Sequence, residues 1–175
     1  MIWQITPRHW KERIDRFLEY LHELTSGRRH VNASENDFAA RWRSWAPYFL
    51  STLRILCGAL FVLYGTTKLF GWPAPVMPDG STAPLASLPG IAGAIELVGG
   101  AFMLLGLFSR RVAFVLSGQM AVAYVMGHAP QGFWPVLNGG VPAVLFCFIW
   151  LYLSAAGPGP WSLDARRRTA TAPIT

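Results

Sequence analysis

Three charged side chains interrupt stretches of sequence that are otherwise apolar. Glu96 lies inside the run 89–107, whereas Arg54 and Lys68 lie inside the run 48–70. A carboxylate beside a cation can hold or pass a proton, and the cation can stabilise an anionic ligand. Charges in such surroundings face protein or a wet cavity and mark functional sites by default. The pattern therefore predicts a buried polar site with Glu96, Lys68 and Arg54 as candidate catalytic groups.

The surroundings of Glu96 in the sequence are unusually small. At helical spacing its neighbours are Ala92, Gly93, Gly99 and Gly100. Small residues let membrane helices approach closely, so we expect Glu96 to point into a helix bundle rather than at lipid. The alternative to a functional role is that Glu96 is a structural hydrogen-bonding pin between helices.

Other polar residues share the depth of Glu96 in the expected helices. Counted at 1.5 Å per residue from the outer helix ends, Gln119 lies about as deep as Glu96, at roughly 12 Å, and Tyr64, Lys68, His128 and Asn138 lie within about 10 Å of that surface. Arg54 lies in the inner half of the bundle. The candidate ligand-binding residues are Arg54, Tyr64, Lys68, Glu96, Gln119, His128 and Asn138. Lys68 and Arg54 lie about 21 Å apart along one helix, on either side of Glu96 in depth. Either can be its counter-ion, and Lys68 can instead extend to the interface.

The elements that must position these residues are membrane spans. Of the 175 residues, 53% are hydrophobic and 14% are charged. Four apolar stretches of roughly the ~20 residues that cross a bilayer occur at 48–70, 87–108, 111–127 and 136–156. We therefore predict an all-α, integral membrane four-helix bundle over 46–165, embedded in the lipid bilayer.

The distribution of charge predicts the orientation of this bundle. The connectors 71–88 and 128–135 contain no Lys or Arg, whereas the amino-terminal segment and the tail 166–175 are basic. The positive-inside rule then places both termini in the cytoplasm of a bacterial inner membrane. The net charge of +6 is explained by these flanking residues, so we do not infer nucleic-acid binding. The connector 71–88 is either a lid over the polar site or a surface loop.

Residues 1–45 form a separate arm in this interpretation. Apolar residues at helical spacing predict an amphipathic helix ending near Gly27, followed by a polar linker at 27–37. These are Trp10, Ile14, Phe17, Leu18, Leu21 and Leu24. The helix either lies in the membrane interface, docks on a partner or is a solvated surface helix.

The sequence contains no residue pattern typical of a metal site or of a redox-active pair of thiols. The four His are scattered without ligand spacing, and Cys57 and Cys147 lie singly in apolar runs with no CxxC motif. The sequence shows no metal, haem or nucleotide signature.

Several segments resemble the DoxX family of small four-helix bacterial membrane proteins. The resemblance rests on residues 54–65 with 68–71, on 91–100 through 105–111, and on 157–164, and it covers about residues 48–166. It implies that Arg54, Lys68 and Glu96 match the charged intramembrane positions of the family. Founding members are associated with quinone-linked thiosulfate oxidation, and relatives with membrane oxidoreductase complexes that handle thiol and oxidative stress.

Three functions remain open at this point. The leading hypothesis is a quinone-interacting subunit of a membrane-associated redox complex, with a redox protein as partner and Glu96 relaying protons. A second is a non-enzymatic membrane anchor or assembly factor for a cytoplasmic partner, and a third is a small transporter. The sequence leaves enzymatic activity, ligand identity and oligomeric state undecided.

Overall fold

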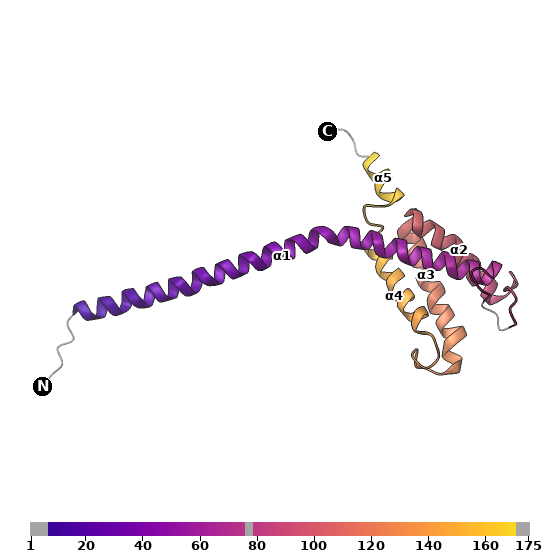
Figure 1. Cartoon of the computed structure of the whole chain (residues 1–175), viewed down its shortest axis with the longest axis horizontal. Helices are drawn as coiled ribbons and strands as arrows, with labels where there is room; N and C mark the ends of the chain where they lie inside the picture. Colours follow the sequence, from indigo (N-terminus) through magenta and orange to yellow (C-terminus); the bar gives the residue numbers. More distant parts are fainter. Residues whose placement is uncertain (1–6, 76–78, 171–175) are drawn as a thin grey trace. The chain divides into compact units, whose positions relative to one another are not determined.

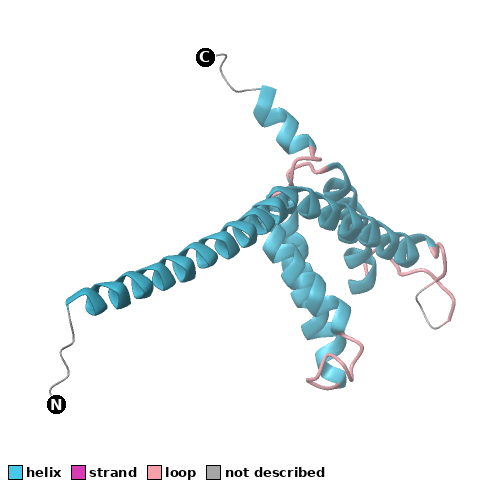
Figure 2. Cartoon of the chain, turned by 60° about the vertical axis from the view of Figure 1, so that its left-hand side comes forward, coloured by secondary structure: helices cyan, strands magenta, loops and turns pink. Residues whose placement is uncertain are grey.

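The computed structural model describes residues 7–75 and 79–170, with side chains for all of these except 7–9, 25–37 and 168–170. In these ranges the chain is helical and contains no strand (Figures 1 and 2). The elements in order are α1 (Pro7–Phe70), α2 (Leu88–Leu105), α3 (Ser109–Ala123), η1 (Tyr124–His128), η2 (Ala129–Gln131), α4 (Val141–Ala156) and α5 (Leu163–Ala170). The chain divides into two compact units, Met1–Trp45 and Ala46–Thr175.

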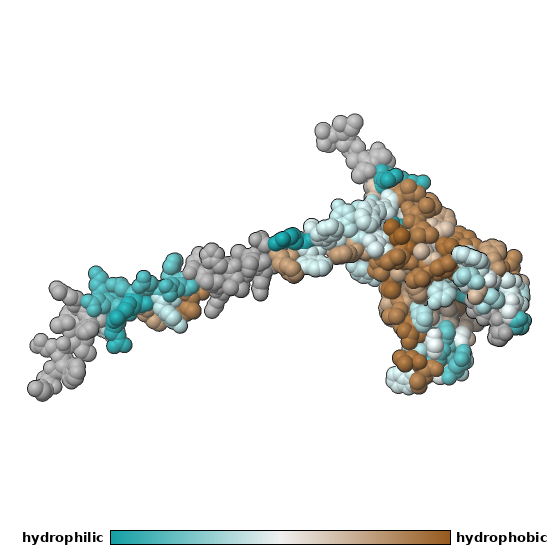
Figure 3. All heavy atoms as spheres, in the orientation of Figure 1, coloured by the Kyte–Doolittle hydropathy of each residue, from teal (hydrophilic) through white to brown (hydrophobic). Residues whose placement is uncertain are grey.

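The predicted fold class, an all-α membrane protein, is confirmed. Within the described residues three helical segments are long and apolar enough to cross a bilayer, at Phe38–Phe70, Leu88–Leu105 and Ser109–Gln131. The fourth, α4, is apolar but has 16 residues. Apolar side chains cover much of the visible face of the second unit, as expected for a lipid-facing surface (Figure 3).

The predicted break at 27–37 is wrong, because α1 continues through it without interruption. No proline lies in α1 between Pro7 and Pro47, and Gly27 alone costs only about 1 kcal/mol in a helix. Asn, Ser and Asp residues in this stretch are weaker helix formers than Ala, but each costs no more than about 0.7 kcal/mol, so composition alone was a poor guide to a linker. Within the first unit the apolar side chains of 10–24 are exposed.

In the second unit α1 and α2 pack with their backbones in close contact. A Cβ atom on Gly65 would lie 2.6 Å from the Leu97 nitrogen, and one on Gly100 would lie 2.8 Å from the Gly58 carbonyl oxygen. No larger residue fits at these positions without moving a helix. The small residues around Glu96 therefore serve the close helix contact that the sequence predicted.

The apolar core of the second unit is built around aromatic rings. The ring of Phe61 on α1 contacts those of Phe146 and Trp150 on α4 at centroid distances of 4.9 Å, both edge to face. Such pairs contribute roughly 0.5–1.5 kcal/mol each beyond the area they bury. Met103 and Leu116 complete this core from α2 and α3. The four helices thus share one interior.

The ends of α2 and α3 explain where the connecting segments begin. Ser87 caps α2 by accepting a hydrogen bond from the Gly90 amide at 3.2 Å, and Gly106 ends it with a φ of 67°. At its far end α3 widens into η1, a π-helical turn that ends at His128. Turns of this kind often occur at functional sites.

Candidate functional site

The buried carboxylate of Glu96 forms an ion pair with Lys68. The Lys68 Nζ lies 2.6 Å from Oε1 and 2.7 Å from Oε2, and Glu96 is only 2% exposed. Gly93 makes room for this contact, since a Cβ there would lie 3.0 Å from the Lys68 Cβ. The counter-ion of Glu96, which the sequence left open between two cations, is therefore Lys68.

Gln119 on α3 joins the pair to a third helix. Its Nε2 donates a hydrogen bond to Glu96 Oε1 at 3.2 Å. Its Oε1 is buried and has no hydrogen-bond partner among the described residues. Because a buried acceptor without a donor is costly, this oxygen has a strong capacity to bind a donor group.

A cavity of about 530 Å³ lies on one side of the ion pair, and we call it the aromatic cavity. Its walls include the rings of Phe61, Tyr64 and Phe146, and Lys68 and Glu96 form part of its polar lining. Cavities of this size that are mostly apolar with a few polar groups are typical ligand sites. The structure thus brings Tyr64, Lys68 and Glu96 together, as predicted from their depth.

A second cavity, of about 640 Å³, also borders Lys68 and is lined mainly by aliphatic residues. We call it the aliphatic cavity. Ile91 and Ile95 contribute from α2, and Gln119 and Val122 from α3. Lys68 is the cation common to both cavities. The polar cluster of Lys68, Glu96 and Gln119 therefore borders two apolar spaces.

His128 lines the aromatic cavity from the end of the π-helical turn. Its Nδ1 lies 3.0 Å from the Asn138 carbonyl oxygen. A carbonyl only accepts, so Nδ1 is the donor in this bond, and Nε2 has no hydrogen-bond partner among the described residues. The Asn138 side chain instead holds its own loop, donating to the Gly132 carbonyl at 2.6 Å and accepting from the Gly140 amide at 2.8 Å.

Arg54 does not line either cavity. Its fully buried guanidinium donates to the carbonyl oxygens of Pro158 at 2.9 Å and Leu104 at 3.1 Å, and also to those of Met103 and Trp161. The C-terminal carbonyls of a helix carry partial negative charge, so this end of α2 is a favourable partner for a cation. Arg54 and Asn138, both expected in the ligand-binding set, make structural contacts in this fold.

Asp164 is a residue whose role the sequence reasoning missed. Its Oδ1 and Oδ2 accept hydrogen bonds from the amides of Phe108 at 2.9 Å and Ser109 at 2.8 Å, which caps the start of α3. Partial burial raises the pKa of Asp164, but hydrogen bonds from Ser109 and Phe108 and the charge of Arg167 outweigh it and lower the pKa below its ordinary value. The capping residue lies 55 positions from α3, so no local pattern could reveal it.

These features define a class: a small multi-helix membrane protein with a buried ion pair beside two cavities. The DoxX family model matches residues 49–129, which hold both members of that pair. An uncharacterized protein of Haemophilus influenzae is 42% identical over 123 residues, covering 69% of this chain and 91% of its own length. An uncharacterized membrane protein of Mycobacterium tuberculosis is 30% identical over 134 residues, covering 69% and 82%. The chain belongs to the DoxX family. No solved structure matches it significantly.

Removal of one partner of the buried ion pair will destabilise the protein more than removal of both. Lys68→Met leaves Glu96 as an uncompensated buried charge, with an expected loss of about 3–5 kcal/mol in unfolding free energy. Lys68→Met/Glu96→Leu should recover most of that loss. Thermal unfolding in detergent, followed by tryptophan fluorescence, measures the difference, with Lys11→Met of the first unit as control. A double variant as unstable as the single one would show that the unpaired charge is not the cause.

Loss of the Asp164 cap will destabilise the bundle in a pH-dependent way. Because the folded-state pKa of Asp164 is lowered, its negative charge stabilises the fold at pH values above the ordinary pKa of 3.8. This electrostatic stabilisation is lost as the pH falls through the folded-state pKa. Asp164→Ala should lower the free energy of unfolding by about 1 kcal/mol at pH 7, and by less below pH 3.8. Unfolding midpoints at the two pH values test this, with the exposed Glu19→Ala as control. An equal loss of stability at both pH values would contradict an electrostatic contribution from the Asp164 carboxylate.

Proposed function

We propose that this DoxX-family protein binds a quinone in the aromatic cavity and serves as the membrane subunit of a redox complex. The observation that carries the proposal is an aromatic-walled cavity with a buried ion pair in its lining. Quinones are flat rings with two carbonyl oxygens and an apolar tail. They need a stacking surface, hydrogen-bond donors and an apolar approach, and the cavity offers all three.

The residues present fit such a ring. The cavity volume of about 530 Å³ lies inside the range of about 300–1,000 Å³ that small-molecule sites occupy. Tyr64 and Phe146 supply aromatic rings to the lining, and these two rings pack edge to face with centroids 6.3 Å apart. The ammonium of Lys68 has three N–H groups, and it can direct one at a carbonyl oxygen while it remains bonded to Glu96.

Proton transfer is the chemistry that this chain supplies. A bound quinone accepts two electrons and two protons when it is reduced. Glu96 and His128 both line the cavity and can hold protons there, and His128 has its Nε2 available. The electrons come from a partner oxidoreductase in this proposal, and Lys68 stabilises negative charge that develops beside it.

Quinone binding is testable with decylubiquinone, a short-tailed analogue, and the full-length protein in detergent. We expect saturable quenching of tryptophan fluorescence, because Trp150 packs against the cavity residue Phe61. Glu96→Gln should weaken binding about tenfold, because the Lys68 ammonium that bonds the quinone loses the carboxylate that holds it in the cavity lining. Ala143→Phe should abolish it by filling the cavity that Ala143 lines.

The matched control is Asp79→Asn, because Asp79 is an exposed carboxylate between α1 and α2 and is not part of the cavity lining. Circular dichroism of each variant separates lost binding from lost folding. Absence of saturable binding to the wild-type protein, or equal binding by all variants, would rule out the quinone site.

The proposal also includes an orientation in the bacterial inner membrane, with both termini in the cytoplasm. Arg110, Arg111 and Arg167 lie at one end of the bundle, whereas the connectors 71–87 and 132–140 contain no Lys or Arg. The positive-inside rule assigns the basic end to the cytoplasm. Alkaline phosphatase fused after Thr175 should be inactive, whereas fusions after Gly80 or Gly132 should be active. The reverse pattern would invert the topology.

A further inference from the structure

At the basic end of the bundle the surface has two adjoining hollows. The first, the arginine recess, has a volume of about 190 Å³ and is lined by Phe108, Arg110, Arg111, Asp164 and Arg167. The second, the apolar groove, has a volume of about 540 Å³. Arg110 lines both, so the two hollows meet at this side chain.

The arginine recess carries a net positive charge. Three arginines line it against one carboxylate, that of Asp164. The oxygens of Asp164 already accept hydrogen bonds from two backbone amides, and the Arg167 guanidinium lies 5.7 Å from the centre of the Phe108 ring. Planar guanidinium groups in this number match a phosphate in charge and in hydrogen-bonding geometry.

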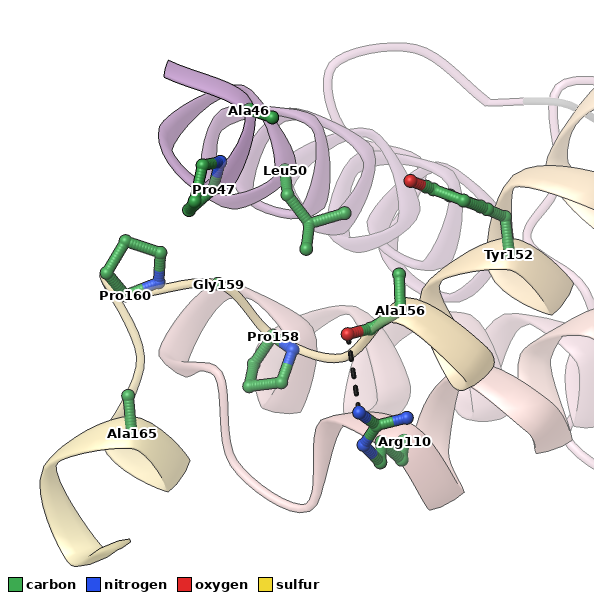
Figure 4. Close-up of a pocket in the computed structure, with 10 residues that line it drawn as sticks. All are labelled: Ala46, Pro47, Leu50, Arg110, Tyr152, Ala156, Pro158, Gly159, Pro160 and Ala165. Atoms are coloured by element: carbon green, nitrogen blue, oxygen red, sulfur yellow. Dashed lines mark hydrogen bonds between the residues drawn. The ribbon is translucent and has the colours of Figure 1, made fainter. Parts of the chain in front are cut away.

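The apolar groove runs between the start of the bundle part of α1 and the segment after α4 (Figure 4). Figure 4 shows Leu50 pointing into it, with Ala156 and Pro158 on the opposite side. Arg110 lies below Ala156 and donates a hydrogen bond to its carbonyl oxygen at 3.3 Å, and another to that of Ser154 at 3.1 Å. Its guanidinium is thus held at the junction between the groove and the recess.

The position of both hollows matches the level of lipid headgroups. They lie where α2 ends at Leu105, α3 begins at Ser109 and α4 ends at Ala156, which is the boundary of the apolar spans. Tyr48 and Trp161, whose ring centroids are 5.5 Å apart, lie at the same end. Aromatic and basic residues together are typical of the membrane interface.

We propose that the arginine recess and the apolar groove together bind one anionic phospholipid, with its phosphate in the recess and an acyl chain in the groove. A free phosphate would match the charge of the recess but would leave the groove unused. The complementarity of charge in one hollow and of apolar surface in the other therefore favours a lipid, and this site is separate from the aromatic cavity.

The test is lipid retention by the full-length protein, measured by native mass spectrometry after equilibration in detergent with phosphatidylglycerol, phosphatidylcholine or inorganic phosphate. We expect the wild-type protein to retain phosphatidylglycerol at least fivefold better than phosphatidylcholine. Arg111→Gln and Arg167→Gln should each lower retention about fivefold, the usual effect of one basic residue at an anionic surface. Arg110 is left intact because it also caps α4.

Two further variants separate a lipid from a simple anion. Leu50→Trp narrows the groove without changing the charge, and it should lower phosphatidylglycerol retention severalfold, whereas the exposed Leu56→Trp should not. Arg111→Lys should keep most of the binding, and Arg13→Gln of the first unit should keep all of it. Circular dichroism confirms folding of every variant.

Three outcomes would overturn the proposal. One is equal retention of the two phospholipids by the wild-type protein. Another is unchanged retention in the Arg111 and Arg167 variants. The third is competition by millimolar phosphate together with no effect of Leu50→Trp, which would identify a site for free anions in place of a lipid site.

Discussion

The burial of an ionised carboxylate among membrane-spanning helices is the constraint on which the rest of this structure depends. Glu96 is stable there because the Lys68 ammonium lies within 2.7 Å of both its oxygens. Around this pair α1 and α2 approach until their backbones nearly touch, which only glycine permits at Gly65 and Gly100. The ion pair and the glycines therefore act on the same helix contact.

The two cations of α1 meet different partners on the same neighbouring helix. Arg54 and Lys68 are 14 residues apart, or close to four turns, so both face α2. Lys68 meets the carboxylate of Glu96 in the middle of α2, whereas Arg54 meets the backbone carbonyls at its end. Arg54 also holds the segment after α4 through Pro158. One face of α1 thus fixes both the depth of α2 and the position of the chain after α4.

Sequence patterns were sufficient for the parts of the fold that depend on composition and spacing. Apolar runs located the spans, and the small neighbours of Glu96 indicated its burial against another helix. The choice between Lys68 and Arg54 as counter-ion could not be made, because the two cations lie on either side of Glu96 in depth and the sequence does not give the position of α2 along α1.

Other features of the structure could not be predicted from the sequence, each for a separate physical reason. The cap by Asp164 joins residues 55 positions apart. Arg54 is bound by backbone carbonyl oxygens, which every residue type has, so the sequence does not identify its partners. The break predicted at 27–37 failed because a helix tolerates an isolated glycine and polar residues. Tertiary contacts decided the first two features, whereas the segment 27–37 shows that a helix tolerates residues of weak local propensity.

Arg54 and the Lys68 cluster differ in how much hydrogen-bonding capacity is left for a ligand. At Arg54 four carbonyl oxygens surround one guanidinium, so little capacity remains for a ligand. At the Lys68 cluster the ammonium has a third N–H group beyond its two bonds to Glu96, and the Gln119 Oε1 has no partner among the described residues. A purely structural pin would be expected to saturate such groups, since each unmet buried one costs about 1–3 kcal/mol. The unpaired Gln119 oxygen and the third N–H group of Lys68 therefore favour the proposed ligand binding at this cluster over binding at Arg54.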